Sequence, residues 1–496
     1  MIPPEEVAVL DANAAEAGIP AAALMKAAGQ GLAASLAAHY LPKGAAAKGT
    51  AILFACGPGN NGGDGYVAAE QLRARCKVTV AVLLPPRTAL AKAALAAFSG
   101  RKVRGEASLP RELERANVIV DALLGVGARG QVREPLRTAI GLINAAAVEG
   151  TPIVSVDVPS GLGTDCAVSP KATVTFHDRK VGMDERACGT IEVVDIGIPQ
   201  RALTHTGRGE VLLIPIPGPT ARKRARGSVL IIGGGPYHGA PLLAAVGAGR
   251  CGVDLVHVVT PPQVVPILAA HHPNLILHAL GGDHLTVADL PRLTQLQQQV
   301  DAVVLGPGLG RAAETIEAIR LAVSQLVRPT VIDADALVAL GPVETNLRRP
   351  KQPQLLLTPH DGEFDHLMGA RPPSEEHLQE RIAATLRAAR RCGCTVLLKG
   401  RTDLIAAPDG QQRSNETGCP PMAVGGTGDV LAGVCGALLS KGLSPFQAAR
   451  AGAWLNGKAG EAAAVRMGHS LQAIEVAESL PAVLLAHHPL WKGARD

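Results

Sequence analysis

The segment AILFACGPGNNGGDGYVAA, residues Ala51–Ala69, determines how the first part of the chain folds. Its first six residues, Ala51–Cys56, are apolar without a break, which predicts a buried strand. Gly57-Pro58-Gly59 ends that strand, and a helix is expected over Val67–Arg75. A buried strand, a tight turn and a helix form the repeating unit of open parallel sheets. The segment therefore predicts a doubly wound α/β domain.

The same alternation of strands and helices extends on both sides of this segment. Helices are predicted over Ala21–His39, Ala89–Phe98 and Glu134–Glu149. Further runs of apolar or β-branched residues predict the other strands: Val78–Leu84, Val118–Leu124, Ile153–Val158, Thr173–Phe176 and Thr190–Ile196. Strands that alternate with helices favour parallel neighbours, so these segments predict one continuous sheet.

A break in the pattern at Ile214–Arg226, IPIPGPTARKRAR, predicts a boundary between domain 1–214 and domain 215–496. A second alternation of strands follows the break: Ser228–Ile232, Val253–Val259, Ala302–Leu305, Thr330–Ile332, Leu355–Thr358 and Thr395–Leu398. The end of the chain is predicted to be mostly helical, over Thr427–Ser440, Pro445–Met467 and Ser470–Ala486. The sequence thus predicts two α/β domains.

The composition excludes several classes of protein. Hydrophobic residues make up 47% of the chain and charged residues 18%, which is enough apolar material for two cores. A net charge of +5 with 2% aromatic residues gives no basis for nucleic-acid binding. The 9 cysteines are scattered without a C-x-x-C motif, which is typical of a reduced, cytoplasmic protein. Met1–Glu6 predicts no signal peptide, and no membrane partner is expected.

The glycine-rich segment Gly57–Tyr66 carries polar side chains that a simple turn does not need. Gly57, Gly59 and Gly62 satisfy the pattern G-x-G-x-x-G. However, the next predicted strand ends at Leu83–Pro86 without an acid for a ribose, which argues against ordinary dinucleotide binding for hydride transfer. The segment could hold phosphate on its backbone amides or a hard cation on its side-chain oxygens. A tight strand–helix turn is the alternative.

Polar residues also follow two other predicted strands of the first domain. Asp121 ends one strand, and Asp157 and Ser160 follow another. Because the carboxyl ends of parallel strands line one crevice, Asn61, Asp121 and Ser160 would offer it amide, carboxylate and hydroxyl oxygens. This set suits a hard cation rather than zinc, and Asp157 is a candidate acid or base. Taken singly, each Asp is better explained as a cap or turn residue, but three such strand ends in one domain favour a site.

The segment Gly425-Gly426-Thr427-Gly428-Asp429 is the most specific motif of the second domain. A glycine turn that enters a helix presents free N–H groups to phosphate oxygens. An Asp at that point can take a proton from a hydroxyl that attacks the phosphate. Because no Walker loop is present, the motif points to the ribokinase-like class. The alternative is glycine-mediated helix packing with a capping Asp.

The first domain closely resembles the YjeF N-terminal family in GNNGGDGYVAA, VDALLGVG, VDVPSGL and Ile191–Pro199, in that order. That family has a Rossmann-like fold and comprises epimerases of hydrated NADH and NADPH, NAD(P)HX, with a potassium ion at the site. The resemblance implies that Asn61, Asp121 and Ser160 are the potassium ligands. It implies a larger set of substrate contacts: Asn60, Asn61, Gly62, Gly63, Asp64, Gly125, Val126, Gly127, Ala128, Arg129, Gly130, Gln131 and Asp157.

The second domain resembles the ADP-dependent NAD(P)H-hydrate dehydratase family. The motifs that carry the resemblance are Gly239-Ala240, Gly306–Gly310, Asp333–Leu337, Thr358–Glu363, Lys399–Asp403 and Gly425–Leu431. The resemblance implies substrate contacts at Ala240, Gly308, His360 and Asp429. It implies nucleotide contacts at Lys399, Gly400, Arg401, Thr402, Asp403 and Gly428.

The two resemblances together imply one bifunctional repair enzyme. Hydration of the nicotinamide ring at C6 gives R and S hydrates. The implied epimerase interconverts them, and the implied dehydratase returns the S form to NAD(P)H while ADP becomes AMP and phosphate. We expect Asp429 and Asp157 to be the catalytic acids or bases. The expected partners are NADHX, NADPHX and ADP with Mg²⁺, and a homo-oligomer is expected from the family.

Two other functions remain open at this point. A ribokinase-like small-molecule kinase would share the glycine motif, but it would leave the first domain unexplained. Alternatively, the first domain is a non-catalytic ligand-binding module. Several positions also depart from the usual family pattern: Lys26, Arg224–Arg226, Asp361, Cys419–Pro421 and Asn456.

Overall fold

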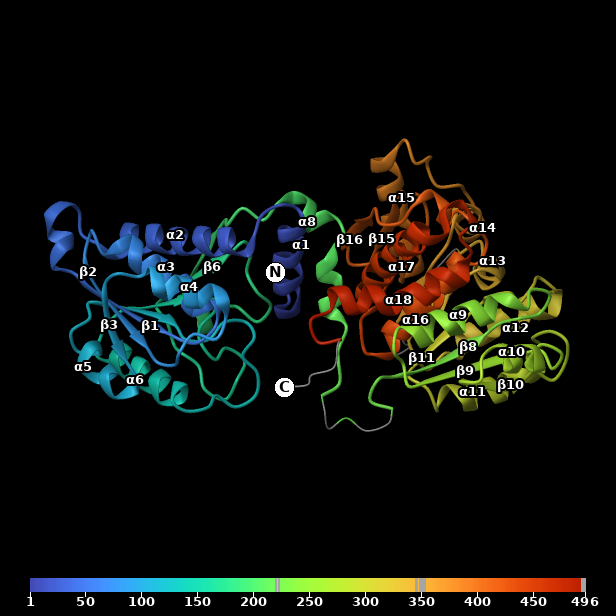
Figure 1. Cartoon of the computed structure of the whole chain (residues 1–496), viewed down its shortest axis with the longest axis horizontal. Coiled ribbons are helices and arrows are strands. Elements are labelled where there is room, and N and C mark those ends of the chain that lie inside the picture. Colours follow the sequence, from blue (N-terminus) through green and yellow to red (C-terminus); the bar gives the residue numbers. More distant parts are fainter. Residues whose placement is uncertain (219–220, 222–223, 344–346, 348–353, 492–496) are drawn as a thin grey trace. The chain divides into compact units, whose positions relative to one another are not determined.

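The computed structural model describes residues 1–218, 221, 224–343, 347 and 354–491. The chain divides into two compact units, Met1–Leu203 and Thr204–Asp496 (Figure 1). The division lies before the boundary predicted after Ile214. The reason is that the short helix η3, Arg208–Leu213, places Glu210 in a buried ion pair with Arg450 of the second unit, at 2.7 Å. The basic segment Arg222–Arg226 lies partly outside the described residues.

The first unit contains a seven-stranded sheet in the order β3-β2-β1-β4-β5-β6-β7. All neighbouring strands are parallel, as a doubly wound sheet requires. The strands are β1 Ala51–Cys56, β2 Lys77–Val82, β3 Arg101–Arg104, β4 Val118–Ala122, β5 Ile153–Val156, β6 Ala172–Phe176 and β7 Thr190–Val194. The strand order reverses between β1 and β4, and this is where such sheets bind ligands.

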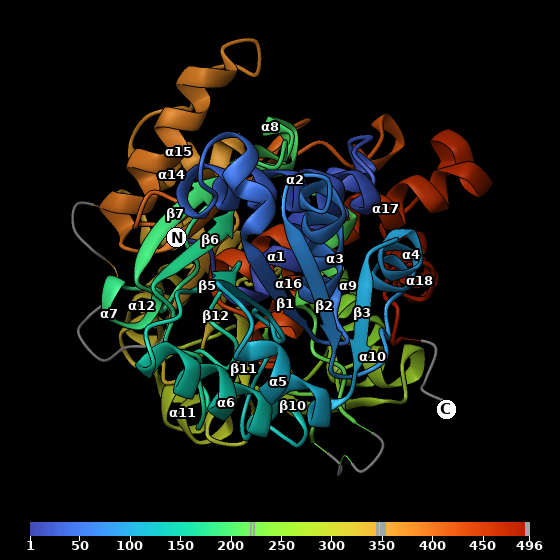
Figure 2. The ribbon, with the colours of Figure 1, turned by 90° about the vertical axis from the view of Figure 1, so that its left-hand side faces the viewer.

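Helices cover both faces of this sheet. Figures 1 and 2 show α2 and α3 on one face and α5 and α6 on the other. The helices are α1 Pro4–Glu16, α2 Ala21–Tyr40, α3 Asn60–Leu72, α4 Ala89–Ala97, α5 Leu109–Leu113, α6 Leu136–Val148, α7 Glu185–Cys188 and α8 Gln200–Thr204. The side chains of β1 alternate between the faces, since Phe54 belongs to the core under α2 and Leu53 to the core over α6. Burial on both faces explains why β1 is apolar throughout.

The second unit contains a nine-stranded sheet in the order β10-β9-β8-β11-β12-β13-β14-β15-β16. The strands are parallel from β10 to β14, and β15 and β16 add an antiparallel edge. The strands are β8 Ser228–Ile232, β9 Leu255–Thr260, β10 Leu275–Ala279, β11 Ala302–Leu305, β12 Thr330–Ile332, β13 Leu355–Leu357, β14 Thr395–Leu398, β15 Asp403–Ala406 and β16 Gln412–Asn415.

Two helical layers enclose the second sheet. One layer, with α9, α16, α17 and α18, packs on the face that carries Val229 and Ile231, and the opposite face carries Leu230 and Ile232. The first-layer helices are α9 Gly239–Arg250, α16 Thr427–Ser440, α17 Pro445–Met467 and α18 Ala473–His487. The remaining helices are α10 Val265–His271, α11 Leu290–Gln297, α12 Ala313–Ser324, α13 Asp335–Leu340, α14 Asp361–Met368 and α15 Leu378–Cys392. The fold class predicted for both domains is confirmed.

The structure corrects the sequence-based prediction in two respects. First, α3 begins at Asn60 and not at Val67, so the glycine-rich segment is itself the first turn of the helix. A Cβ atom at Gly62 would lie 2.2 Å from the Gly57 carbonyl oxygen, and this close approach needs glycine. Second, the strands β3, β10, β15 and β16 were not predicted. Of these, β3 (RKVR) and β16 (QRSN) are edge strands without an apolar run.

Candidate functional site

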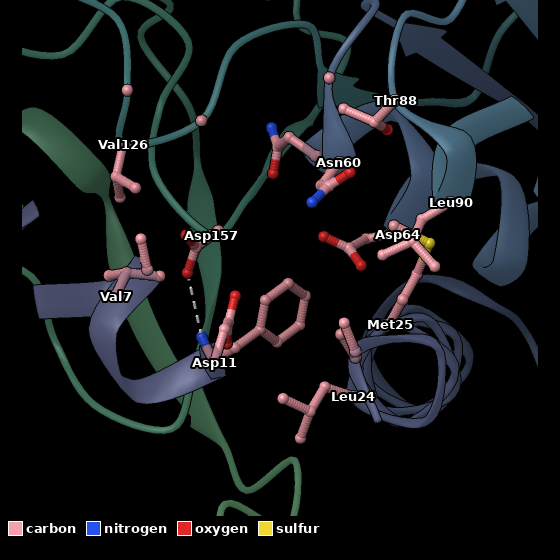
Figure 3. Close-up of a pocket in the computed structure, with 18 of the residues that line it drawn as sticks. Val7, Asp11, Leu24, Met25, Asn60, Asp64, Thr88, Leu90, Val126 and Asp157 are labelled. Atoms are coloured by element: carbon pink, nitrogen blue, oxygen red, sulfur yellow. Dashed lines mark hydrogen bonds between the residues drawn. The ribbon is translucent and has the colours of Figure 1, made fainter. Parts of the chain in front are cut away.

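The first unit contains a cavity of about 610 Å³ at the carboxyl edge of its sheet. Its walls come from α1 and α2, from the first turn of α3, and from the segments that follow β4, β5 and β6. Leu24 and Met25 of α2 line an aliphatic side, Val7 of α1 lies across from them, and polar groups line much of the rest (Figure 3). The cavity lies at the edge where the strand order reverses, as the sequence predicted for the crevice.

Asn61, Asp121 and Ser160, the predicted cation ligands, are brought together beside this cavity. The Ser160 hydroxyl donates to Asp121 Oδ1, and the Ser160 backbone N–H donates to Asp121 Oδ2 at 2.9 Å. Asn61 Nδ2 donates to the Leu124 carbonyl at 3.1 Å, and the Leu124 N–H donates to Ser160 Oγ at 2.8 Å. Burial raises the pKa of Asp121, although hydrogen bonds from Ser160 and Ser155 oppose the rise. The three oxygen-bearing side chains therefore share one buried network.

Asp157 forms a buried ion pair with Lys180 at the cavity wall. Lys180 also donates to Thr175 Oγ1 at 2.9 Å and to the Phe176 carbonyl at 2.8 Å, so each of its protons has an acceptor. The φ angle of Asp157 is 63°, in the left-handed region that non-glycine residues rarely adopt. Such strain is concentrated at functional sites.

Two more carboxyl groups line the same cavity. Asp64 comes from the first turn of α3 and Asp11 from α1, and in Figure 3 both point toward the space beside Asp157. Burial and then the charge of Asp157 raise the pKa of Asp11 to about 6, against the opposing charge of Lys180. Burial and the charges of Asp157 and Asp11 raise the pKa of Asp64 well above its ordinary value. Both carboxyl groups are thus harder to ionise than an ordinary Asp.

The remaining substrate contacts implied for the first domain separate into two groups. Asn60, Gly125, Val126, Gly127 and Ala128 line the cavity. Arg129, Gly130 and Gln131 do not line it, and instead they border a second hollow together with Arg133 and Arg137. Gly62 and Gly63 are buried inside the first turn of α3, where a Cβ at Gly63 would lie 2.5 Å from Met25. Their place next to the cavity is structural packing.

In the second unit, Lys399 lies among carboxylates at the end of β14. Its ammonium group is 2.8 Å from Asp333 Oδ1 and 3.5 Å from Glu363 Oε2. Burial lowers the pKa of Lys399, but Asp333 and Glu363 outweigh burial and raise it above its ordinary value. The Thr358 hydroxyl also donates to Asp333 Oδ1 at 2.8 Å. Strand ends β12, β13 and β14 thus contribute to one cluster.

Asp429 faces this cluster from the first turn of α16. Gly426, just before the helix, has a φ of 97°, which glycine adopts readily and which lets the chain turn into the helix. A Cβ at Gly428 would lie 3.3 Å from Lys399 Nζ, so the lysine reaches the start of the helix. Burial, followed by the charge of Asp333, raises the pKa of Asp429 to about 7, against the charge of Lys399. An acid that titrates near neutrality beside free helix amides suits proton transfer next to a phosphate.

His360 lies at the N-terminus of α14, next to the same cluster. Its Nδ1 accepts from the Gly362 N–H at 3.0 Å, and Glu363 Oε2 accepts from the His360 N–H at 2.9 Å. The ring is 59% exposed, so it caps the helix and stays accessible. Asp361, one of the positions expected to depart from the family pattern, pairs with the buried Arg381, which gives it a structural role.

The predicted nucleotide-binding segment Lys399–Asp403 connects β14 to β15. The Gly400 N–H donates to Asp403 Oδ1 at 3.1 Å, and the Arg401 N–H donates to Glu375 Oε1 at 2.6 Å. Burial raises the pKa of Asp403 to about 6. Thr402 is half-buried in the same turn. A further hydrogen bond holds the start of the segment: the Lys399 backbone N–H donates to the Pro359 carbonyl at 2.8 Å.

Ala240 and Gly308, the other predicted substrate contacts, are neighbours. Ala240 is in the first turn of α9 and Gly308 follows β11, and a Cβ at Gly308 would lie 3.1 Å from Ala240 Cβ. The Gly310 N–H donates to Asp335 Oδ2 at 2.8 Å. Asp335 in turn contributes to the raised pKa of Asp429. The loop that follows β11 and contains Gly308 and Gly310 therefore lies at the same edge of the sheet as Asp429.

Sequence reasoning assigned no role to Asp11, Lys180, Asp333 or Glu363. Asp333 directly follows the buried strand β12, so the rule that strand ends line the site could have found it. Glu363 is three residues after His360, and this spacing indicates only a capping role for Glu363. The sequence therefore showed no sign of its second contact, with Lys399. Asp11 and Lys180 carry no local signal. Asp11 is one of several acidic residues in α1, and Lys180 follows the end of β6 by four residues.

The described part of the chain shows neither a cluster of metal-binding side chains nor a single membrane-spanning helix. In these residues, no group of three His, Cys, Asp or Glu side chains is arranged to hold a metal ion. No single described helix has the length and apolarity to cross a membrane; α1 and α2 reach that composition only together, with a bend of 117° between them.

Known proteins resemble both units. The family described as YjeF-related protein N-terminus matches residues 21–182, and the family described as NAD(P)H-hydrate dehydratase matches residues 229–482. The bifunctional NAD(P)H-hydrate repair enzyme Nnr of Pyrobaculum aerophilum is 41% identical over 97% of this chain and 97% of its own. The enzyme of the same name from Methanothermobacter thermautotrophicus is 37% identical over 97% of this chain and 95% of its own.

A solved structure matches the second unit. It is the ADP/ATP-dependent NAD(P)H-hydrate dehydratase from Bacillus subtilis, co-crystallised with ATP and Mg²⁺. It is 26% identical, with a TM-score of 0.50, and the match covers 57% of this chain and 99% of that chain.

Proposed function

This chain belongs to the bifunctional NAD(P)H-hydrate repair enzymes, and we propose which residues of its two units carry the two reactions. The first unit is the epimerase domain, which interconverts the R and S hydrates of NADH and NADPH. The second unit is the dehydratase domain, which returns the S hydrate to NAD(P)H at the expense of ADP, with AMP and phosphate as products. The observation that carries the proposal is the arrangement at the start of α16, where Asp429 lies in the first turn and the Lys399 ammonium group reaches Gly428.

In the second unit, Asp429 acts as the base for the 6-hydroxyl group. It takes the hydroxyl proton as the oxygen attacks the β-phosphate of ADP, and AMP leaves. The amides of Gly426–Gly428 and the Lys399 ammonium group offset the charge that develops on the phosphate. The phosphate then leaves C6 with the bonding electrons while the ring nitrogen supplies its lone pair. Loss of a proton from C5 completes the double bond of NAD(P)H.

The rest of the dehydratase site binds and orients the two substrates. Ala240, Gly308 and His360 contact the hydrated nicotinamide; Gly308 packs against Ala240, and His360 lies beside Glu363, which contacts Lys399. Lys399–Asp403 and Gly428 contact the nucleotide. No described group of three ligating side chains offers a complete site for Mg²⁺. Mg²⁺ would therefore enter with the nucleotide phosphates, with at most one or two carboxylates from the protein, as is usual for this ion.

In the first unit, we propose Asp157 as an acid or base of the epimerase. It moves a proton during opening of the ring or transient loss of the hydroxyl. Its ion pair with Lys180 fixes its position, and its strained backbone aims it at the cavity. Asn60, Asp64 and Gly125–Ala128 surround the substrate.

The oxygen network beside the cavity fits a potassium ion. Asn61 uses its Nδ2 to donate to Leu124, which leaves Asn61 Oδ1 available as a ligand. Asp121 and Ser160 add a carboxylate and a hydroxyl, so the donor set is all oxygen with one negative charge. Such a set suits a hard cation of low charge. When bound, the ion would fix the segments after β4 and β5 in place through these three side chains.

A mixture of R and S NADH hydrates tests the proposal. The purified protein is incubated with the mixture, ADP, Mg²⁺ and K⁺, and NADH absorbance and AMP are followed. Recovery of all NADH, faster than spontaneous epimerisation allows, with one AMP per NADH, is expected. A stop at the S fraction would mean that the first unit is a non-catalytic module.

The kinase alternative predicts a different result from the same incubation. A ribokinase-like kinase would use ATP and release a stable phosphorylated product, and no NADH would appear. A homo-oligomer also remains part of the proposal, and light scattering coupled to gel filtration checks it.

A further inference from the structure

The cavity of the first unit holds more acid groups than the proposed epimerase uses. Three carboxyl groups, Asp11, Asp64 and Asp157, line it together with Lys180. Epimerisation by ring opening moves one proton from the C6 hydroxyl oxygen to the ring nitrogen N1. Since these are two different atoms, a single carboxylate held rigidly on one wall serves only one of them well. A second proton-transfer group is therefore needed.

Asp157 is firmly held by its neighbours. Its Oδ1 accepts from Lys180, from the Thr175 hydroxyl at 3.2 Å and from the Phe176 N–H at 3.3 Å. All three protons of Lys180 have acceptors in turn, so this lysine is an anchor. Asp64 lies in the first turn of α3 on another wall of the cavity, and burial and then the charge of Asp157 raise its pKa well above the ordinary value.

Asp11 differs from both. No described side chain or backbone group hydrogen-bonds to its carboxyl group, and it is only half-buried, toward the cavity. Figure 3 shows its carboxyl group between Asp157 on one side and Asp64 on the other. Its pKa of about 6, set by burial and the charge of Asp157, lets it both take up and release a proton near neutrality.

The chain also fixes the helix that carries Asp11. Just before α1, Ile2 pairs with the segment around Lys180: its N–H donates to the Arg179 carbonyl at 2.7 Å, and its carbonyl accepts from the Val181 N–H at 2.9 Å. The N-terminal ammonium group lies 2.9 Å from Asp178. These bonds tie α1 to the segment that supplies Lys180. Asp11 is thus held over the cavity by specific contacts.

We propose that Asp11 is a second proton-transfer residue of the epimerase and acts directly on the hydroxyl group of the hydrated nicotinamide ring. This inference rests on the proposed epimerase function of the first unit. As a carboxylate, Asp11 takes the hydroxyl proton while the C6–N1 bond breaks. The electron pair of that bond goes to N1, and C6 becomes an aldehyde carbon. The same proton passes by way of Asp157 to N1.

The return path closes the ring. Rotation about the C5–C6 bond presents the other face of the aldehyde to N1, and the same steps run backwards. One proton and one electron pair move in each direction, and no co-reactant is consumed. The charged or titratable groups that line the cavity with Asp11 are Asp157, Lys180, Asp64, His177 and Arg87. Burial lowers the pKa of His177, so it stays neutral at pH 7 and leaves Asp11 to titrate near 6.

The test follows interconversion of pure S-NADH hydrate to the R form in the full-length protein, with K⁺ and without ADP. Asp11→Asn should lower kcat about 100-fold with little change in KM. Asp11→Glu should keep part of the activity. Glu16→Gln, at the exposed end of the same helix, should match the wild type. Because Asn has the shape of Asp, the folded state should persist, and circular dichroism checks it.

The pH profile separates a chemical role from a structural one. In the wild type, kcat for epimerisation should rise as pH rises through about 6, because the carboxylate form of Asp11 is the active one. This limb should disappear in Asp11→Asn. Full activity in Asp11→Asn, or a limb that persists in it, would overturn the inference while the epimerase function stands. A wild type that does not interconvert the hydrates would overturn both.

Discussion

Each unit places a buried lysine against a carboxylate at the carboxyl edge of its sheet. Lys180 pairs with Asp157 in the first unit, and Lys399 pairs with Asp333 in the second. Strained backbone accompanies both pairs, since Asp157 has a φ of 63° and Ala334, next to Asp333, has a φ of 52°. Each site also holds an acid of raised pKa beside its lysine–carboxylate pair, about 6 for Asp11 and about 7 for Asp429.

The surroundings of these two acids differ. Asp429 lies in the first turn of α16, where backbone amides and Lys399 can hold a phosphate. Asp11 lies in the middle of α1, away from the amide end of its helix, and faces a cavity with an aliphatic side. A lysine–carboxylate pair can therefore support proton transfer alone in one unit and proton transfer coupled to phosphate chemistry in the other. Variants of the two sites should separate these two kinds of chemistry.

Asp429→Asn should abolish dehydration in the second unit and leave epimerisation in the first unit intact. We expect the dehydratase kcat to fall by about 10³, because the base is lost and the hydroxyl cannot be activated. The epimerase rate should not change. Stopped assays for AMP and chromatography of the two hydrates measure the two rates in one sample. Asp409→Asn, in an exposed turn of the same unit, is the control. Near-normal dehydration in Asp429→Asn would contradict the proposed role.

Potassium should stabilise the first unit. At 100 times its Kd, a ligand that binds only the folded state adds about 2.7 kcal/mol to the free energy of unfolding. Thermal unfolding in KCl against a large-cation salt should show this gain, and Asn61→Ala should lose it. Asn144→Ala, whose side chain binds the Ala167 carbonyl away from the cavity, should keep it. An equal gain in Asn61→Ala would place the ion elsewhere.

Lys399→Met should move the pH profile of dehydration. In the wild type, kcat should rise as pH rises through about 7, because Asp429 acts as a carboxylate. Lys399 lowers the pKa of Asp429, so its removal should move the limb to higher pH. If the midpoint of the limb rises by about one pH unit, this shift alone lowers the rate at pH 7 roughly fivefold, in addition to the loss of the charge that Lys399 offers to the phosphate. Lys458→Met, on a half-exposed lysine of α17, should leave the profile unchanged. A limb that stays in place would show that another group titrates.

Asp11→Asn should have a modest effect on stability that depends on pH. The folded-state pKa of Asp11 is raised to about 6, so the unfolded chain loses this proton first as pH rises from 4. The free energy of unfolding therefore falls as pH rises from 4 to 6, and above pH 6 it falls no further on account of Asp11. Removing the charge should stabilise the protein by roughly 1 kcal/mol at pH 8, and not at pH 4. Thermal melts at the two pH values compare the variants. An equal Tm change at both would contradict the raised pKa.

The sequence predicted most of the fold, and the reason lies in burial. Strands β1, β8, β11, β12 and β14 were located within their observed bounds, because strands covered on both faces are apolar throughout. The edge strands β3, RKVR, and β16, QRSN, were not predicted, because they are partly exposed and carry charged or polar side chains. The start of α3 was also misplaced, since glycines in a first turn look like a loop.

The site was predictable to a smaller extent. Asn61, Asp121, Ser160 and Asp157 follow strands of one sheet, so the rule of strand ends brought them together. Asp11 could not be found in this way, because it comes from a helix that precedes the sheet, and only the folded chain carries it over the cavity. For the same reason, the pairing of Lys399 with Glu363 appears only in the structure.

A complementation experiment tests whether each unit carries its own reaction on its own acid. Asp429→Asn and Asp157→Asn proteins are prepared separately and given a mixture of R and S NADH hydrates with ADP, Mg²⁺ and K⁺. Alone, the first should recover no NADH and the second should stop at the S fraction. Mixed together, they should recover all the NADH at a rate near that of the wild type. Recovery that still stops at the S fraction in the mixture would contradict two independent sites.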